Sequence, residues 1–278
     1  YAIITNIDRE HMDYYGSMDK LNKYFVNFVN KVPSFGKSFI CLDNKNNKNL
    51  LKKLKNKNFY TYGIDNNSNY SIKNIKQFRE YSEYDLKIKL PNKKIIIIKK
   101  IKIPLLGAHN IKNSVAATAV ALNVGLSISN IKKGLKNFKG VQRRFNKIFS
   151  FNKVDFFDDY AHHPTEISSI LEGVSKVYNR RKIITVFEPH RYSRVMSLKQ
   201  AFSKSFIKSD LVLICPMYAA GEKKDLNFNL LSFAKLISKN SKIQTVIVKN
   251  QKELLNYFKK NLISDEIIIG MGAGSISQ

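Results

Sequence analysis

The densest group of chemically active side chains lies in the segment from Asp158 to Glu166, which reads Asp-Asp-Tyr-Ala-His-His-Pro-Thr-Glu. It follows an apolar run that begins at Val154 and is typical of a buried strand. Polar groups packed this densely at a strand end are costly unless they are used, so we predict a functional site here. Because His162 and His163 are adjacent, their side chains should diverge, which argues against a metal site with two histidine ligands.

A second group follows the next predicted strand, in the segment from Phe187 to Arg194. Arg191 and Arg194 lie three residues apart, so their guanidinium groups could converge on one carboxylate. His190 could donate a hydrogen bond beside them. This pattern indicates an anion-binding strand end in the position expected for a substrate.

Two segments in the first half carry weaker signals. His11 and Asp13 follow the first predicted strand and could hold Mg²⁺ or a phosphate-bound metal, although Mg²⁺ prefers oxygen ligands. Taken alone, a loop with a helix cap explains them better. Asn110, in the segment from Gly107 to Asn113, precedes an Ala-rich helix, where its amide could pair with an adenine edge. Capping of that helix by Asn110 is an equally good interpretation.

Three further segments suit contacts to phosphate or to a ligand. Arg143 and Arg144 could bind phosphate, although a solvated basic linker is the commoner explanation in so basic a chain. Residues 218–222 follow another predicted strand. The glycines of residues 270–275 permit close backbone approach to a ligand, but they lack the full context of a dinucleotide-binding motif.

Hydrophobic periodicity predicts two successive series of strands and helices with a linker at residues 134–140. In the first series we expect strands at 3–4, 38–42, 58–63, 85–90 and 94–98, the last two forming a hairpin around Pro91-Asn92. We expect helices in the same series at 18–32, 49–54, 110–122 and 128–135. In the second we expect strands at 154–158, 182–187, 211–215, 244–248 and 266–270, and helices at 164–177, 196–207, 230–237 and 251–262. This alternation predicts an α/β fold with parallel, doubly wound sheets, whose ligands bind at the carboxyl ends of the strands.

Composition excludes some classes of function. The net charge of +27 comes from evenly spread lysine that accompanies Asn and Ile, as A/T-rich codons would produce, so nucleic-acid binding is not expected as the main function. Apolar runs such as Ile95 to Ile98 are too short to cross a membrane. Cys41 and Cys215 are expected to be buried free thiols in a reducing, cytoplasmic setting. The chain does not begin with Met, so we expect it to start inside a longer protein.

Taken together and in order, the motif segments resemble those of the Mur ligases along essentially the whole chain. Thr5-Asn6 with His11-Met12-Asp13 is similar to that family's T-N…D-H-M-D, and residues 107–113 to its G-x-H-N-x-x-N. The remaining motifs are similar to G-V-x-R-R-F at 140–145, D-D-Y-x-H-H-P-T-E at 158–166, P-H-R-Y-S-R at 189–194, Y-A-A-G-E at 218–222 and G-A-G-[DS]-I at 272–276. Each motif is weak alone, but the ordered set is specific.

The resemblance implies a three-domain ligase. Residues 1–140 would form the C-terminal part of its central ATP-binding domain, and residues 141–278 its C-terminal Rossmann-like domain. The implied reaction joins L-alanine to UDP-N-acetylmuramate, with ATP and Mg²⁺, through an acyl phosphate. The P-H-R-Y-S-R form favours the alanine-adding activity within the family.

The resemblance also implies roles for individual residues. It assigns His11 to the metal–phosphate site, Asn110 to adenine, and Arg143, Arg144 and Asp159 to the nucleotide. Around the incoming alanine and the acyl phosphate it places Tyr160, His162, His163, His190, Arg191 and Arg194. The residues it assigns to catalysis are His11, His163, Arg191 and Arg194.

Two departures from the family pattern stand out. Glu10 occupies a position where Asp is usual, and the ATP phosphate loop G-x-x-x-x-G-K-[ST] is absent, as is the UDP-binding domain. We therefore expect the 278-residue chain alone to be inactive and to bind ATP weakly. Alternatives are the family member that recycles murein tripeptide, a non-catalytic basic binding module, and a degenerating gene. The sequence does not indicate an oligomeric state.

Overall fold

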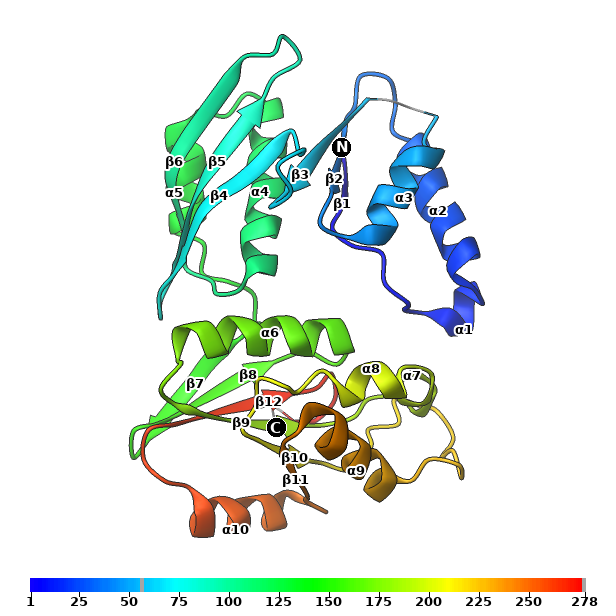
Figure 1. The fold of residues 1–278 in the computed structure, drawn as a ribbon, viewed down its shortest axis with the longest axis vertical. Helices are drawn as coiled ribbons and strands as arrows, with labels where there is room; N and C mark the ends of the chain where they lie inside the picture. Colours follow the sequence, from blue (N-terminus) through cyan, green and yellow to red (C-terminus); the bar gives the residue numbers. More distant parts are fainter. Residues whose placement is uncertain (56–57, 277–278) are drawn as a thin grey trace. The chain divides into compact units, whose positions relative to one another are not determined.

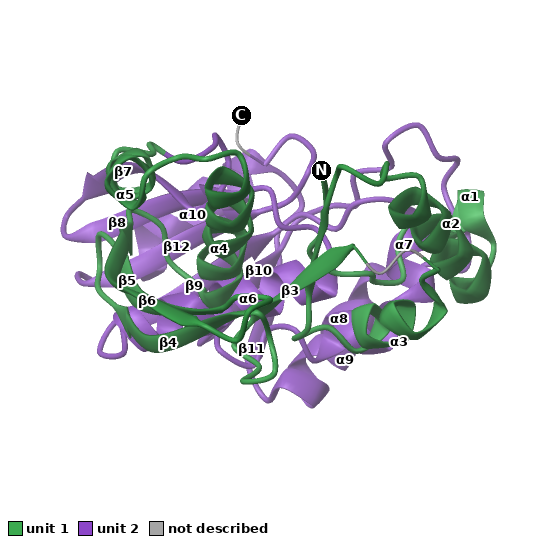
Figure 2. Ribbon diagram, turned by 90° about the horizontal axis from the view of Figure 1, so that it is seen from above, with its two compact units in different colours: residues 1–139 green, residues 140–278 purple. Residues whose placement is uncertain are grey.

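The computed structural model describes residues 1–55 and 58–276. The chain divides into two compact units, Tyr1–Lys139 and Gly140–Gln278 (Figure 2). Each unit contains one sheet and the helices that pack on it (Figure 1). The prediction of an α/β fold is confirmed.

The first half of unit 1 is a parallel αβ arrangement. Within the described residues its sheet has the order β1-β2-β3-β4-β5-β6, and β1 to β4 pair in parallel. The apolar residues of the helix at 18–30 recur at helical spacing, so one face of this helix, with Leu21 and Val29, is buried against this part of the sheet. The elements are β1 (Ala2–Ile4), α1 (Met12–Tyr15), α2 (Met18–Asn30), β2 (Ser38–Cys41), α3 (Lys45–Lys53) and β3 (Phe59–Gly63).

The second half of unit 1 is antiparallel, and this antiparallel part extends beyond the single hairpin that was predicted in an otherwise parallel sheet. The strands are β4 (Tyr70–Gln77), β5 (Ser82–Lys89) and β6 (Ile95–Ile103), and the helices are α4 (Ala108–Asn123) and α5 (Ile128–Lys136). The hairpin expected between residues 85 and 98 exists but is longer, and β4 was not predicted. In the core, the Tyr84 hydroxyl lies 2.7 Å from Ser114 Oγ of α4, which joins the helix to the sheet.

Unit 2 is the Rossmann-like, doubly wound part of the chain. Its described strands have the order β11-β10-β9-β12-β8-β7, all parallel except β7 at the edge. Strand β12 lies between β8 and β9, so the carboxyl ends of these three strands meet where the strand order reverses. The strands are β7 (Asn146–Phe151), β8 (Val154–Asp159), β9 (Lys182–Phe187), β10 (Leu211–Ile214), β11 (Gln244–Ile247) and β12 (Glu266–Met271).

The helices of unit 2 connect these strands. They are α6 (Pro164–Val177), α7 (Tyr192–Ser197), α8 (Lys199–Ser203), α9 (Leu230–Ser241) and α10 (Gln251–Asn261). The single helix predicted at 196–207 is instead two short helices, and the first of them begins at Tyr192. This earlier start places Arg194 on a helix rather than in a loop. Among the described residues, no helix combines the length and the apolar character that a bilayer crossing requires.

Candidate active site

The candidate site lies in unit 2, where loops leave the carboxyl ends of β8, β9, β10 and β12. Parallel pairing brings these ends to one edge of the sheet, so segments far apart in sequence become neighbours. His190 and Tyr218 form a parallel bridge there, beyond the ends of β9 and β10. The site is therefore built from loops that a rigid sheet positions.

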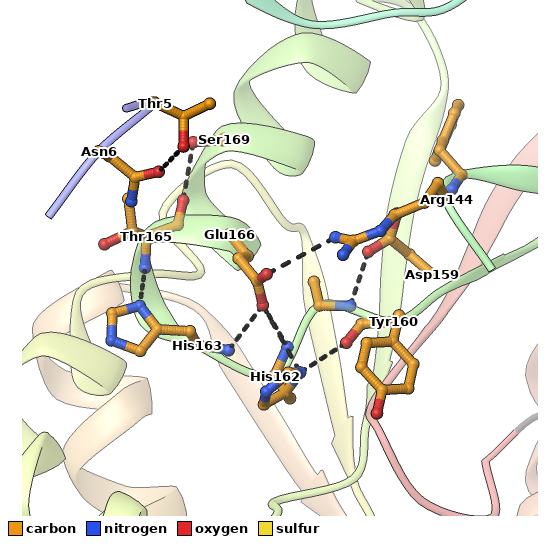
Figure 3. Close-up of polar contacts among 12 residues, drawn as sticks. Thr5, Asn6, Arg144, Asp159, Tyr160, His162, His163, Thr165, Glu166 and Ser169 are labelled. Atoms are coloured by element: carbon orange, nitrogen blue, oxygen red, sulfur yellow. Dashed lines mark hydrogen bonds and ion pairs between the residues drawn. The ribbon is translucent and has the colours of Figure 1, made fainter. Parts of the chain in front are cut away.

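A carboxylate organises the loop after β8. The Glu166 Oε2 atom accepts hydrogen bonds from the backbone N–H groups of His162 at 3.1 Å and His163 at 3.2 Å (Figure 3). Its other oxygen lies 3.6 Å from Arg144 Nη1. With Pro164 in the first turn, this is a capping box that starts α6 immediately after the site residues.

His163 serves as the N-cap of α6. Its Nδ1 atom accepts a hydrogen bond from Thr165 N at 3.3 Å, so in the neutral ring the proton is on Nε2. The ring is buried, and Nε2 has no hydrogen-bond partner among the described residues. His163 is therefore arranged as a helix cap through Nδ1 and as a hydrogen-bond donor through Nε2–H. Neither nitrogen offers a lone pair to a substrate, so this form of His163 does not fit a general base.

His162 faces different groups, as expected for an adjacent histidine. Its Nδ1 donates to the carbonyl oxygen of Tyr160 at 2.8 Å, so the neutral ring carries its lone pair on Nε2 (Figure 3). Its ring lies 5.5 Å from the ring of His190, which comes from the next strand. The structure thus places the rings of His162 and His190 side by side.

Asp159 is fully buried at the end of β8. Its oxygens accept backbone N–H groups from Ala161 at 2.7 Å and from Phe145 at 2.8 Å. These bonds fix the loop and the Arg143–Phe145 turn, where Arg143 and Phe145 both have positive φ. A nucleotide contact by Asp159 stays a prediction, and in unit 2 its contacts are structural.

The two linker arginines differ in their surroundings. Arg143 donates to Asp158 Oδ2 at 3.3 Å and to the carbonyl oxygen of Gly272 at 2.7 Å, so it ties β8 to the loop after β12. Its guanidinium also lies 4.9 Å from the centre of the Tyr160 ring. The Arg144 side chain is half exposed. Arg144 is thus the better placed of the two for a ligand phosphate.

Burial of Asp159 predicts an unusual titration. Desolvation raises the pKa of its carboxyl from 3.8 to about 6, against the lowering effect of the backbone hydrogen bonds and of Arg144. The folded protein therefore favours the protonated form of the Asp159 carboxyl. The stability of the folded state that this preference contributes is fully present below pH 3.8 and is lost as the pH rises through about 6. The ¹³C carboxyl resonance of Asp159 is identified as the one that disappears in the Asp159→Asn variant. We expect this resonance to titrate near pH 6. A midpoint below 4 would show that the hydrogen bonds outweigh burial.

The loop after β9 carries the predicted anion-binding group. Arg194 Nη1 donates to His190 Nδ1 at 3.2 Å, which leaves the ring proton of His190 on Nε2. The His190 ring stacks on Tyr218, with centroids 5.4 Å apart and an interplanar angle of 13°. Burial, His162 and the two arginines lower the pKa of His190 to about 4. His190 is thus a neutral donor near neutral pH.

The loop after β12 packs against this group. Ser275 donates to Glu188 Oε2 from its backbone N–H at 3.2 Å and from its hydroxyl at 2.8 Å. A Cβ on Gly274 would lie 2.5 Å from Tyr218 Cγ, so only glycine allows this close approach. Burial, with a smaller contribution from the charge of Glu188, raises the pKa of Cys215 to about 12, so this thiol stays protonated. Both cysteines are free and buried, as predicted.

His11 and Asn110 belong to unit 1. His11 is exposed, has left-handed backbone angles and forms the N-cap of α1 without a side-chain bond. The described residues contain no group of three His, Cys, Asp or Glu side chains that could hold a metal ion.

Asn110 lies in the first turn of α4, and its amide donates to the carbonyl oxygen of Leu106 at 2.7 Å. The capping residue is Gly107, not Asn110 as one interpretation had it. The role of Asn110 toward adenine stays a prediction.

Three acidic residues near the site were not assigned a role from sequence. Glu166 could have been found from its position three residues after the N-cap, next to Pro164. Glu188 and Glu222 act through contacts between separate loops, which no local pattern reveals.

Comparison with known proteins identifies the family. The profile described as Mur ligase middle domain matches residues 1–121, and the one described as Mur ligase, glutamate ligase domain, matches residues 143–274. The chain belongs to the Mur ligase family, and the resemblance of its motifs is confirmed.

Relatives in two bacteria carry a more specific name. The chain is 59% identical to the UDP-N-acetylmuramate–L-alanine ligase of Pelagibacter ubique, over 100% of this chain and 60% of the relative. It is 40% identical to the protein of that name from Rickettsia canadensis, over 99% and 59%. The chain thus spans about 60% of the length of the curated relatives it matches.

Solved structures share the fold. The UDP-N-acetylmuramate-alanine ligase of Thermotoga maritima matches with a TM-score of 0.72 and 23% identity, over 99% of this chain and 56% of that one. MurF from Acinetobacter baumannii matches with a TM-score of 0.75 and 18% identity, over 98% and 56%.

Proposed function

We propose that this chain is the larger part of an ATP-dependent ligase that joins L-alanine to UDP-N-acetylmuramate. The observation that carries the proposal is the group of His190, Arg191 and Arg194 at the end of β9, with His162 beside it. Two guanidinium groups and a neutral donor suit the carboxylate of a small amino acid. Relatives at 59% and 40% identity that are named UDP-N-acetylmuramate–L-alanine ligase support the same function.

In this proposal the two parts of the chain contact different parts of the substrates. Residues 1–140 are the C-terminal part of the central ATP-binding domain, where Asn110 meets adenine, and residues 141–278 are the C-terminal domain. Arg144 reaches the nucleotide phosphates, with Arg143 and Asp159 holding its segment in place. Mg²⁺ neutralises phosphate charge when bound, and His11 supplies at most one ligand to it. Two buried free thiols fit a reducing, cytoplasmic setting.

The chemistry we propose is acyl transfer. ATP converts the muramyl carboxylate into an acyl phosphate, and the amine of alanine attacks its carbonyl carbon. A C–N bond forms, the bond from carbon to the phosphate oxygen breaks, and inorganic phosphate leaves. His162 Nε2 carries the lone pair that can accept the amine proton. In this proposal the partly exposed ring of Tyr160 contacts the substrate, and the buried His163 supplies an Nε2–H donor.

The test is an acceptor panel with the full-length protein. Phosphate release from ATP is measured with UDP-N-acetylmuramate and, in turn, L-alanine, L-serine, glycine and murein tripeptide. Release that depends on L-alanine is the expected result. Release with the tripeptide alone would replace the proposal with the recycling reaction, and no release with any acceptor would refute a ligase.

A further inference from the structure

Arg191 has a backbone conformation that a non-glycine residue rarely adopts. Its φ is 65° and its ψ is 125°, and it directly precedes α7, the helix that carries Arg194. Strained residues of this kind persist only where the surrounding structure holds them, and they concentrate at functional sites. The contacts that hold Arg191 therefore decide where both guanidinium groups point.

Backbone bonds from the loop after β10 hold one side of Arg191. Its N–H donates to the carbonyl oxygen of Tyr218 at 2.9 Å, and the Tyr218 N–H donates to Pro189 at 2.8 Å. These two bonds extend the parallel pairing of β9 and β10 beyond the strands. They fix the residue before α7, but they leave the first turn of the helix to other groups.

The Glu222 carboxylate holds the other side. Its Oε2 accepts the backbone N–H of Ser193 at 3.1 Å, and its Oε1 accepts the Ser193 hydroxyl. Ser193 lies between Arg191 and Arg194, and the Glu222 N–H is itself anchored on Ala219 at 3.0 Å. One carboxylate thus accepts hydrogen bonds from both the backbone N–H and the hydroxyl of a residue that lies between the two arginines.

We propose that Glu222 is a positioning residue for the acceptor site: through Ser193 it holds Arg191 and Arg194 in the orientation that binds the carboxylate of the incoming amino acid. It contacts the first turn of α7 from a separate loop. The identity of the acceptor rests on the function proposed above, whereas the contact between Glu222 and Ser193 does not.

The test compares steady-state constants of the full-length protein. Glu222→Ala removes both bonds and is expected to raise the KM for L-alanine about ten-fold or more, with the KM for ATP within about two-fold of the parent. Glu222→Gln keeps one oxygen acceptor, so its KM for L-alanine should lie between those of the parent and Glu222→Ala. Ser193→Ala should raise the KM for L-alanine, and Ser193→Thr, which keeps the hydroxyl, should restore it.

Glu172→Ala is the matched control, because Glu172 pairs with Lys176 on the exposed face of α6. It should leave both KM values unchanged. If Glu222→Ala left the KM for L-alanine unchanged, or raised the KM for ATP equally, the positioning role would be overturned. If the parent used another amino acid or the tripeptide, the same comparison would be made with that acceptor.

Hydrogen exchange provides a reading that does not depend on turnover. Glu222→Ala should accelerate amide exchange in the peptide that contains residues 191–194, while Glu172→Ala should not. Unchanged exchange in that peptide would overturn the proposal even if the parent were an L-alanine ligase. If Glu222→Ala exchanged faster than the parent in that peptide, the positioning role would be supported. If the parent also showed no ligase activity, the proposed function would be refuted while the positioning role remained.

Discussion

Replacing Arg191 with alanine in the full-length protein is expected to lower kcat/KM for L-alanine by roughly 30- to 1000-fold. This range corresponds to about 2 to 4 kcal/mol, which is typical when one partner of a buried, charge-assisted hydrogen-bonded pair is removed. We expect the loss mainly in the KM for L-alanine, because a carboxylate is bound equally in the ground state and the transition state. Steady-state kinetics with saturating ATP and UDP-N-acetylmuramate measures it.

Two further variants sharpen this experiment. Arg180→Ala removes an exposed arginine from the turn before β9 and should leave the kinetics unchanged. Arg191→Lys keeps the charge but loses the planar fork, so it should recover only part of the affinity. Full activity of Arg191→Ala would refute a carboxylate-binding role for this residue.

Gly274→Ala is expected to destabilise unit 2 and to impair the acceptor site together. A Cβ at this position would lie 2.5 Å from Tyr218 Cγ and even closer to Glu188 Oε1, both of which are held by other contacts. Overpacking of this kind costs about 1 to 3 kcal/mol, so the melting temperature should fall by roughly 3 to 10 °C. Displacement of Tyr218 should also disturb its stacking partner His190 and raise the KM for L-alanine.

The same substitution at Gly134 is the control. Gly134 lies within α5, and a Cβ there would meet no atom within 4 Å. Since alanine favours a helix over glycine by up to about 1 kcal/mol, Gly134→Ala should raise the melting temperature slightly. Differential scanning calorimetry of both variants measures the contrast. Equal effects of the two substitutions would contradict the packing described around Gly274.

The sequence predicted the alternating elements better than the pairing between them. In unit 2, buried apolar runs marked the parallel strands, and these were found near their expected positions. Strand β7 was missed because all but one of its residues are exposed, so its pattern shows no buried face. Strand β4 was missed because its pairing with β5 is interrupted between Lys73 and Lys76, where Asn74 has positive φ.

The candidate site was predictable where function depends on residue type in a short segment. His162, His190 and Arg194 were named from sequence, and the structure brings them together. The burial of Asp159 and the capping role of His163 depend on how the β8 loop closes on itself. Glu222 acts on Ser193, 29 residues away, through loops that only the strand order makes neighbours. No local pattern encodes such a contact.

The open edge of the sheet in unit 1 bears on whether copies of the protein associate with one another. Strand β6 is paired only with β5 among the described strands, and its residues Ile95, Ile96 and Ile97 are exposed. An apolar open edge invites pairing with another copy, and charged residues blunt it. Here Lys99, Lys100 and Lys102 follow directly on the same strand, and the whole chain carries a charge of +27. The lysine excess thus keeps molecules apart in dilute salt, and added salt weakens this protection by screening.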